Sequence, residues 1–180
     1  MSRPTCLRFI LCTLVLCALC DGVEAQQKGT ASHLQSEHRE AVEQWLAQRP
    51  NLRPAVDGDY AYKRDLAAER SGAVDYHPFY LVADFNGDKK DDFAIALVNI
   101  RKKTANFVLA VFNGPITKDS LPAFFREGLD FRRMSFSAAE DFDDARRTSL
   151  FVQNPNTGKG WMLSLGRKGY FLKPSQEDFT

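Results

Sequence analysis

Residues 84–92 have the types and spacing best suited to binding a metal ion. The segment reads Asp-Phe-Asn-Gly-Asp-Lys-Lys-Asp-Asp, so side-chain oxygens recur at alternate positions. Calcium is a hard cation that takes six to eight oxygens from carboxylates, amides and backbone carbonyls. Because a curled loop presents alternate residues to its centre, we expect five of these residues to converge on one calcium ion. They are Asp84, Asn86, Asp88, Asp92 and, through its backbone carbonyl, Lys90.

Charge repulsion within the segment also favours an ion. Several carboxylates in so short a stretch repel one another, and a bound cation removes that cost. The alternative is a polar turn without an ion, because Asn and Gly satisfy turn geometry by themselves. If an ion binds, we expect its role to be structural, because apolar strand-like residues flank the segment on both sides and would hold it on a sheet.

The run from Asp84 to Ala96 resembles the calcium loop and following strand of the FG-GAP and VCBS repeat families. The resemblance covers roughly residues 78–98, and it implies an extracellular protein with the same five calcium ligands. Those families have glycine after the third ligand, where the backbone favours a positive φ. Here Lys89 stands at that position, which carries a steric cost for a residue with a Cβ. A single repeat cannot close a β-propeller, so the adhesion functions of those families are not carried over.

The N-terminus is typical of a secretory signal peptide. Arg3 and Arg8 precede an apolar run over residues 9–19, and a small-residue cleavage site follows, ending at Ala25. The apolar run has roughly half of the ~20 residues that a membrane-spanning helix needs. We therefore expect cleavage after the signal peptide and no membrane span in the mature chain.

The domain organisation follows from this assignment. We expect residues 1–25 to be the signal peptide, residues 26–31 to be a flexible N-terminus and residues 32–180 to form a single globular α+β domain. The protein would then be secreted or periplasmic.

Cysteine content and charge exclude several classes of function. All four cysteines lie within the expected signal peptide, so the mature chain has no disulfide, thiolate metal site or cysteine nucleophile. The formal net charge of +1 lacks the basic excess that nucleic-acid binding requires.

The hydrophobic pattern predicts six strands. The second is apolar on both faces and is expected at the centre of a sheet, and a short polar turn joins it to the third as an antiparallel hairpin. Turn-forming residues also separate the last three. The strands are predicted at 78–83, 93–100, 106–112, 149–153, 160–165 and 170–172.

Helical spacing predicts an amphipathic N-terminal helix. It is expected to start at the N-cap Ser32, to carry Trp45 in its apolar stripe and to end at Arg49 before a proline. A second helix is predicted over 59–70 and a short third over 122–127. The predicted fold class is α+β, with a mostly antiparallel sheet of five or six strands packed against the N-terminal amphipathic helix.

Other candidate residues receive structural interpretations. His38 is interpreted as a packing residue and His77 as a strand-entry residue, although His77 is the only plausible general base. Glu140, Asp141, Asp143 and Asp144 form a second acidic cluster, interpreted as a solvated loop.

The sequence therefore indicates an exported, monomeric, non-enzymatic module with a structural calcium loop, which binds an unknown protein or cell-surface component. Two alternatives remain open. One is a small extracellular hydrolase that uses carboxylates, such as those of the second acidic cluster. The other is a structural domain that binds no metal.

Overall fold

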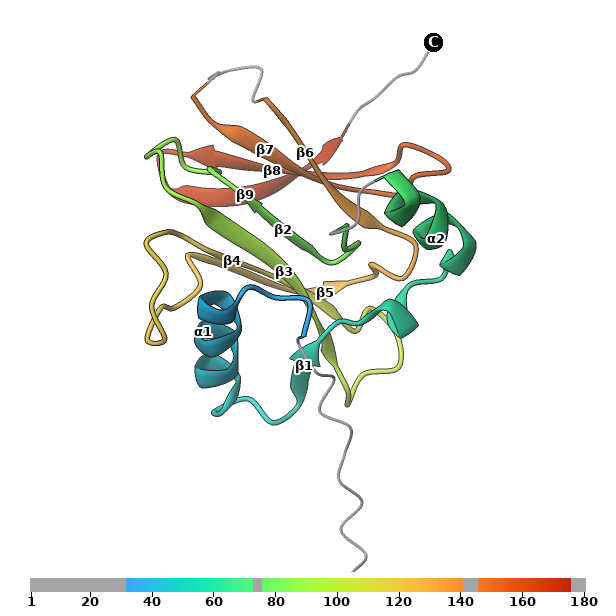
Figure 1. Cartoon of the computed structure of the whole chain (residues 1–180), viewed down its shortest axis with the longest axis horizontal. Helices are drawn as coiled ribbons and strands as arrows, with labels where there is room; N and C mark the ends of the chain where they lie inside the picture. The colour runs from blue at the N-terminus through green and yellow to red at the C-terminus, as the bar shows by residue number, and fades with distance from the viewer. Residues whose placement is uncertain (1–31, 73–75, 141–145, 176–180) are drawn as a thin grey trace, which may run out of the picture.

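Two antiparallel sheets form most of the structure (Figure 1). The computed structural model describes residues 32–72, 76–140 and 146–175. The expected signal peptide and the expected flexible N-terminus lie outside these ranges.

Sheet A has five strands. Its order is β1-β3-β4-β5, and β2 pairs with the first half of β3 while β1 pairs with the second half. β3 therefore lies between two neighbours along most of its length, as its apolar pattern predicted. The strands are β1 (Leu52–Pro54), β2 (Tyr80–Ala83), β3 (Asp92–Asn99), β4 (Phe107–Phe112) and β5 (Phe124–Leu129).

Sheet B is a four-stranded meander in the order β6-β7-β8-β9. The predicted turns after β7 and β8 are present as connections between antiparallel neighbours. The strands are β6 (Ser135–Glu140), β7 (Thr148–Gln153), β8 (Gly160–Gly166) and β9 (Gly169–Ser175).

The helices are short. α1 spans Ser36–Leu46 and α2 spans Lys63–Gly72, with a 3₁₀ turn at Asp57–Asp59. The N-cap of α1 is Gln35, so the prediction of Ser32 as the N-cap was wrong. None of the helices in the described part of the chain is long and apolar enough to span a bilayer.

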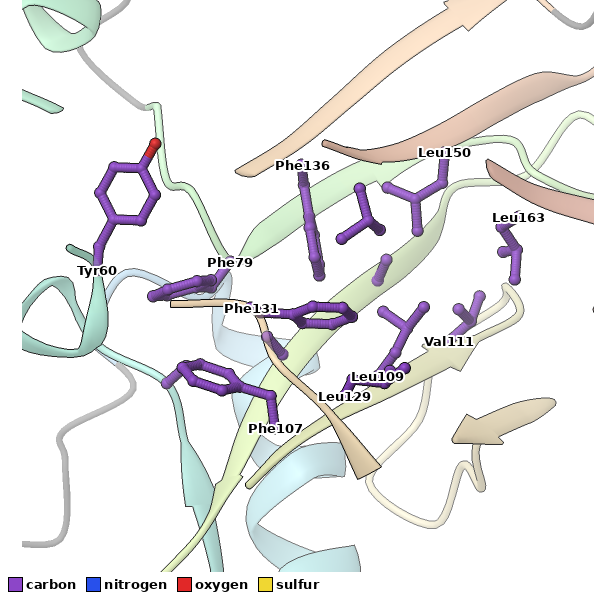
Figure 2. Packing of buried hydrophobic residues seen from close by; sticks show 14 of the residues in the cluster. Tyr60, Phe79, Phe107, Leu109, Val111, Leu129, Phe131, Phe136, Leu150 and Leu163 are labelled. Atoms are coloured by element: carbon purple, nitrogen blue, oxygen red, sulfur yellow. The ribbon is translucent and has the colours of Figure 1, made fainter. Parts of the chain in front are cut away.

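The main hydrophobic core lies between the two sheets. Figure 2 shows aromatic and aliphatic side chains from both sheets meeting in this layer, including Leu109 of β4 and Leu150 of β7. Alternation along each strand directs every second side chain inward, so the two inner faces meet as in other sheet-on-sheet packings. A second buried cluster joins side chains of β3 and β4 with Leu34, Val42 and Trp45.

The prediction of an α+β fold with mostly antiparallel strands is confirmed. The number of strands was wrong, because the described residues form nine strands in two sheets instead of five or six in one. The predicted helix over 122–127 was also wrong, since Phe124–Leu129 is β5 and pairs with β4. Local helix preference there is overridden by pairing with a buried strand.

Candidate metal centre

The segment 84–92 is the connection between β2 and β3 of sheet A. Its ends are fixed opposite each other, because Ala83 and Asp92 are partners in the antiparallel register. The chain between them forms no regular element and curls back on itself over a short distance. A rigid pair of strands therefore holds the loop, as its apolar flanks predicted.

Asp84 lies at the start of the loop, and its carboxylate organises the backbone that follows. Oδ1 accepts hydrogen bonds from the N–H groups of Gly87 at 2.7 Å and Asp88 at 3.2 Å. Oδ2 accepts a third from the N–H of Lys89 at 2.8 Å. The loop therefore wraps around the Asp84 carboxylate.

Asn86 and Asp88 repeat the same pattern on a smaller scale. The amide oxygen of Asn86 accepts the N–H of Asp88 at 2.8 Å, and Oδ1 of Asp88 accepts the N–H of Lys90 at 2.9 Å. Side-chain oxygens that cap a neighbouring N–H in this way form Asx turns. Each such oxygen has two lone pairs, so one hydrogen bond leaves acceptor capacity for a cation.

Asp92 differs from the other acidic residues because it is fully buried. Oδ2 accepts the N–H groups of Phe85 at 2.9 Å and Asn86 at 3.2 Å, and Oδ1 accepts that of Gly114 at 2.8 Å. Burial raises the pKa of Asp92 and the charge of Asp88 raises it further, while these backbone hydrogen bonds lower it. The carboxylate of Asp92 therefore joins the loop to the connection after β4.

The backbone of the loop takes up two left-handed conformations. Gly87 has φ = 79° and Lys89 has φ = 67°. A positive φ at Lys89 agrees with the expectation that a glycine-favouring position is occupied here by a residue with a Cβ. At Gly87 a Cβ would lie 2.7 Å from Cγ of Arg147, the residue before β7, so the close approach of these two segments also requires glycine.

The loop contacts sheet B as well as sheet A. The carbonyl of Asp84 accepts the N–H of Thr148, the first residue of β7, at 2.8 Å. Near the buried end of the loop, the hydroxyl of Tyr170 on β9 donates to Oδ1 of Asn113 at 2.8 Å. Burial raises the pKa of Tyr170, and the charges of Asp92, Asp84 and Asp88 raise it further. The three carboxylates therefore act on one phenol and share one electrostatic environment.

The side chains of the expected metal ligands make hydrogen bonds and an ion pair within the protein. Within the described ranges, no three His, Cys, Asp or Glu side chains lie together in a group that could hold a metal ion. The carboxylates of Asp84 and Asp92 are instead engaged by backbone N–H donors, and Nζ of Lys90 lies 3.9 Å from Oδ2 of Asp88. Calcium binding by Asp84, Asn86, Asp88, Lys90 and Asp92 stays a prediction.

The histidines form a second polar group that sequence reasoning missed. His38 is buried, stacks on Phe93 with ring centroids 4.2 Å apart, and bonds through Nδ1 to the Tyr80 hydroxyl at 2.7 Å, which confirms its packing role. The ring centroids of His33 and His77 lie 4.6 Å apart. These two residues are distant in sequence, and no local motif predicts their contact.

The second acidic cluster lies mostly outside the described residues. Asp141, Asp143 and Asp144 fall in the gap between residues 140 and 146, and Glu140 at the end of β6 is exposed.

Comparison with known proteins assigns neither a family nor a function to the chain. No protein-family model matches the chain, and no curated protein or solved structure is significantly similar to it.

Proposed function

We propose that the protein is an exported, non-enzymatic module whose 84–92 loop binds one structural calcium ion, and which binds a protein or a cell-surface component. The observation that carries the proposal is the hydrogen bonding of the Asp84 carboxylate by the N–H groups of residues 87–89. These bonds hold an anionic oxygen pair on the inner side of the loop before any ion arrives. Such preorganisation lowers the entropic cost of ion binding.

The charge distribution of the loop supports a cation at its centre. The negative charge of Asp88 raises the pKa of Asp92, so the two carboxylates repel each other. A divalent ion would offset this repulsion, and the amide oxygen of Asn86 and the carbonyl of Lys90 would supply neutral ligands. The resemblance of residues 78–98 to FG-GAP and VCBS loops points to the same ligand set.

The position of the loop supports a structural role for the ion. The loop contacts the start of β7 through Asp84 and Thr148, and the connection after β4 through Asp92 and Gly114. An ion that stiffens the loop would therefore stabilise the junction of the two sheets. Binding to the native state alone raises the free energy of unfolding, by about 2.7 kcal/mol at a hundredfold excess over Kd.

The expected signal peptide supports export, and exposed apolar side chains support a partner. Leu121, Trp161 and Phe171 are large, apolar and exposed. Aromatic side chains of this kind are enriched where proteins bind one another. We also propose that the amphipathic N-terminal helix covers sheet A, because Val42 and Trp45 share a buried cluster with side chains of β3 and β4.

A metal-free structural domain is the second candidate, and one observation favours it. The carboxylates of Asp84 and Asp92 each accept three backbone N–H groups, so hydrogen bonds alone stabilise both charges. In that case the loop is a metal-free clasp, a loop that joins the two sheets through its hydrogen bonds alone and needs no ion.

Thermal unfolding with calcium and with chelator distinguishes the two candidates. We expect calcium to raise the Tm of the wild type and of Asp91→Asn, a control whose exposed side chain lies in the same segment but is not an expected ligand. Asp88→Asn keeps an oxygen that can cap Lys90 but removes a charge, so the calcium effect should shrink strongly. An unchanged Tm in all three proteins would favour the metal-free clasp.

A further inference from the structure

All three histidines of the chain gather at the start of β2. His33 lies 4.6 Å from His77 and 6.0 Å from Tyr80 between ring centroids, and His38 bonds to the Tyr80 hydroxyl at 2.7 Å. His33 belongs to the segment that leads into α1, and His38 lies on α1 itself. The N-terminal part of the described chain is therefore attached to β2 through imidazole rings.

The surroundings of His33 favour its neutral form. Burial lowers the pKa of His33 to about 4, and the neighbouring His77 contributes to this shift. Arg70 of α2 also lowers the pKa of His33, and only Asp57 opposes the change. Protonation of this ring therefore weakens its contact with β2.

The Asp57 carboxylate pairs with the cation of this cluster, the Arg70 guanidinium. Asp57 forms two hydrogen bonds with the Arg70 guanidinium, at 2.7 and 3.0 Å, and Arg70 also donates to Nδ1 of His77 at 3.1 Å. Since Arg70 lowers the pKa of Asp57, this carboxylate stays ionised in mild acid. Protonation of His33 and His77 would add two positive charges beside Arg70 and would put two donors face to face at Nδ1 of His77.

His38 is the second attachment point. Its ring is 4 % exposed and stacks on Phe93 with the planes 13° apart. Burial lowers the pKa of His38, while the charges of Glu37 and Asp91 act in the opposite direction. Because this site has little access to water, desolvation disfavours a charged ring there too.

We propose that neutral His33 and His38 form a latch that holds the segment from His33 to Leu46 against β2, and that a mildly acidic medium opens this latch. Because Val42 and Trp45 on that segment share a buried cluster with Phe93, opening exposes the apolar outer face of sheet A. The latch is distinct from the calcium loop, and it depends on none of the five expected calcium ligands.

The direction of the pH dependence follows from proton linkage. An exposed histidine has a pKa near 6.5, whereas that of His33 in the latch is about 4, so the open form binds more protons between these values. The latch is fully effective above pH 6.5 and weakens as the pH falls toward 4. With allowance for solvent screening, the opening equilibrium constant rises on the order of tenfold or more.

Acrylamide quenching of Trp45 fluorescence tests the proposal. The chain has two tryptophans, so Trp161→Phe leaves Trp45 as the sole reporter, and chelator in every sample removes any effect of calcium. We expect quenching to increase between pH 6.5 and 4 while the far-ultraviolet circular dichroism of the strands persists. Loss of the strand signal at the same pH as the rise in quenching would indicate global unfolding and would overturn the proposal.

Matched variants assign the transition to the histidines. In the double variant His33→Phe/His38→Phe, which retains aromatic rings but cannot be protonated, the quenching transition should disappear. Glu40→Gln, an exposed site on the same helix, should leave it unchanged. If the double variant does not fold, each single variant should reduce the pH dependence, and an unchanged profile in both would also overturn the proposal.

Discussion

The loops at the two ends of β3 have opposite charge, and they differ in how far their own side chains order the backbone. Before β3, the acidic loop 84–92 is held by its own side chains and contacts both sheets. After β3, the turn 100–105 carries Arg101, Lys102 and Lys103, is exposed throughout, and has Lys102 paired with Glu127 at 3.1 Å. Both loops join strands of one antiparallel sheet, so the difference arises from the side chains.

The contrast shows that short side chains with acceptor oxygens, such as Asp and Asn, can fix the backbone of a tight loop. Long cationic side chains such as Lys cannot. A tight loop turns several N–H groups inward, and a carboxylate or amide one or two bonds from the chain can accept them. The ammonium of a lysine is a donor on a flexible stem and is easily solvated. In the basic turn the only comparable contact uses an acceptor, since Oδ1 of Asn99 accepts the N–H of Arg101 at 3.1 Å.

Removing the buried acceptor should give the largest effect. We expect Asp92→Ala to lower the free energy of unfolding by about 3 kcal/mol or more, because three backbone N–H groups lose a charged partner inside the protein. In the basic turn, Lys102→Ala should change it by less than about 0.5 kcal/mol, because its ion pair is exposed. Urea unfolding of both variants measures the comparison.

Asp92→Asn serves as the control for that measurement, because an amide oxygen retains half of the acceptors. It should fall between the wild type and Asp92→Ala. Equal changes in the free energy of unfolding for Asp92→Ala and Lys102→Ala would contradict the claim that side chains order the acidic loop but not the basic turn.

A methyl group at Gly87 should have an intermediate effect. Gly87 has a positive φ of 79°, and a Cβ there would meet Cγ of Arg147 at 2.7 Å. We expect Gly87→Ala to cost about 1–3 kcal/mol in the free energy of unfolding, from backbone strain and the clash together. The control is Gly128→Ala, with φ of 80° and no atom near its Cβ, which should cost less. A smaller loss for Gly87→Ala than for Gly128→Ala would mean that Gly87 does not pack against Arg147.

Relief of backbone strain should give the smallest effect, and it should be similar in both loops. Lys89 has φ = 67° and Ala105 has φ = 46°. Lys89→Gly and Ala105→Gly should each raise the free energy of unfolding by up to about 1 kcal/mol, since relief of strain is partly offset by glycine's greater freedom in the unfolded chain. Thermal unfolding without calcium measures both, and a clear loss of stability at Lys89 would show that its side chain contributes a contact.

Periodicity predicted the fully buried strands β3 and β4 within a few residues, because continuous apolar runs mark buried strands. It also predicted β2, although the residues of β2 are only half-buried. β6 escaped prediction because Ser135–Glu140 carries one large apolar residue, Phe136, among small and polar ones. The residues of β5 have no pattern that distinguishes a strand from a helix, and only pairing with β4 decides between them.

The candidate loop was predictable in its residues but not in its surroundings. Alternate spacing identified Asp84, Asn86 and Asp88, and the missing glycine identified Lys89 as the left-handed position. The contacts with Thr148 and Gly114 join segments that are remote in sequence, so no local pattern could predict them. The same limit applies to the histidine latch, because His33 and His38 contact His77 and Tyr80, which are remote from them in sequence.

Titration calorimetry with calcium tests the central claim most directly. We predict binding of one ion to the wild type, weaker binding to Asp88→Asn, and binding to Asp91→Asn that is indistinguishable from the wild type. Absence of heat at several temperatures, together with a Tm that calcium does not change, would contradict the account and would leave the loop as a metal-free clasp between two sheets.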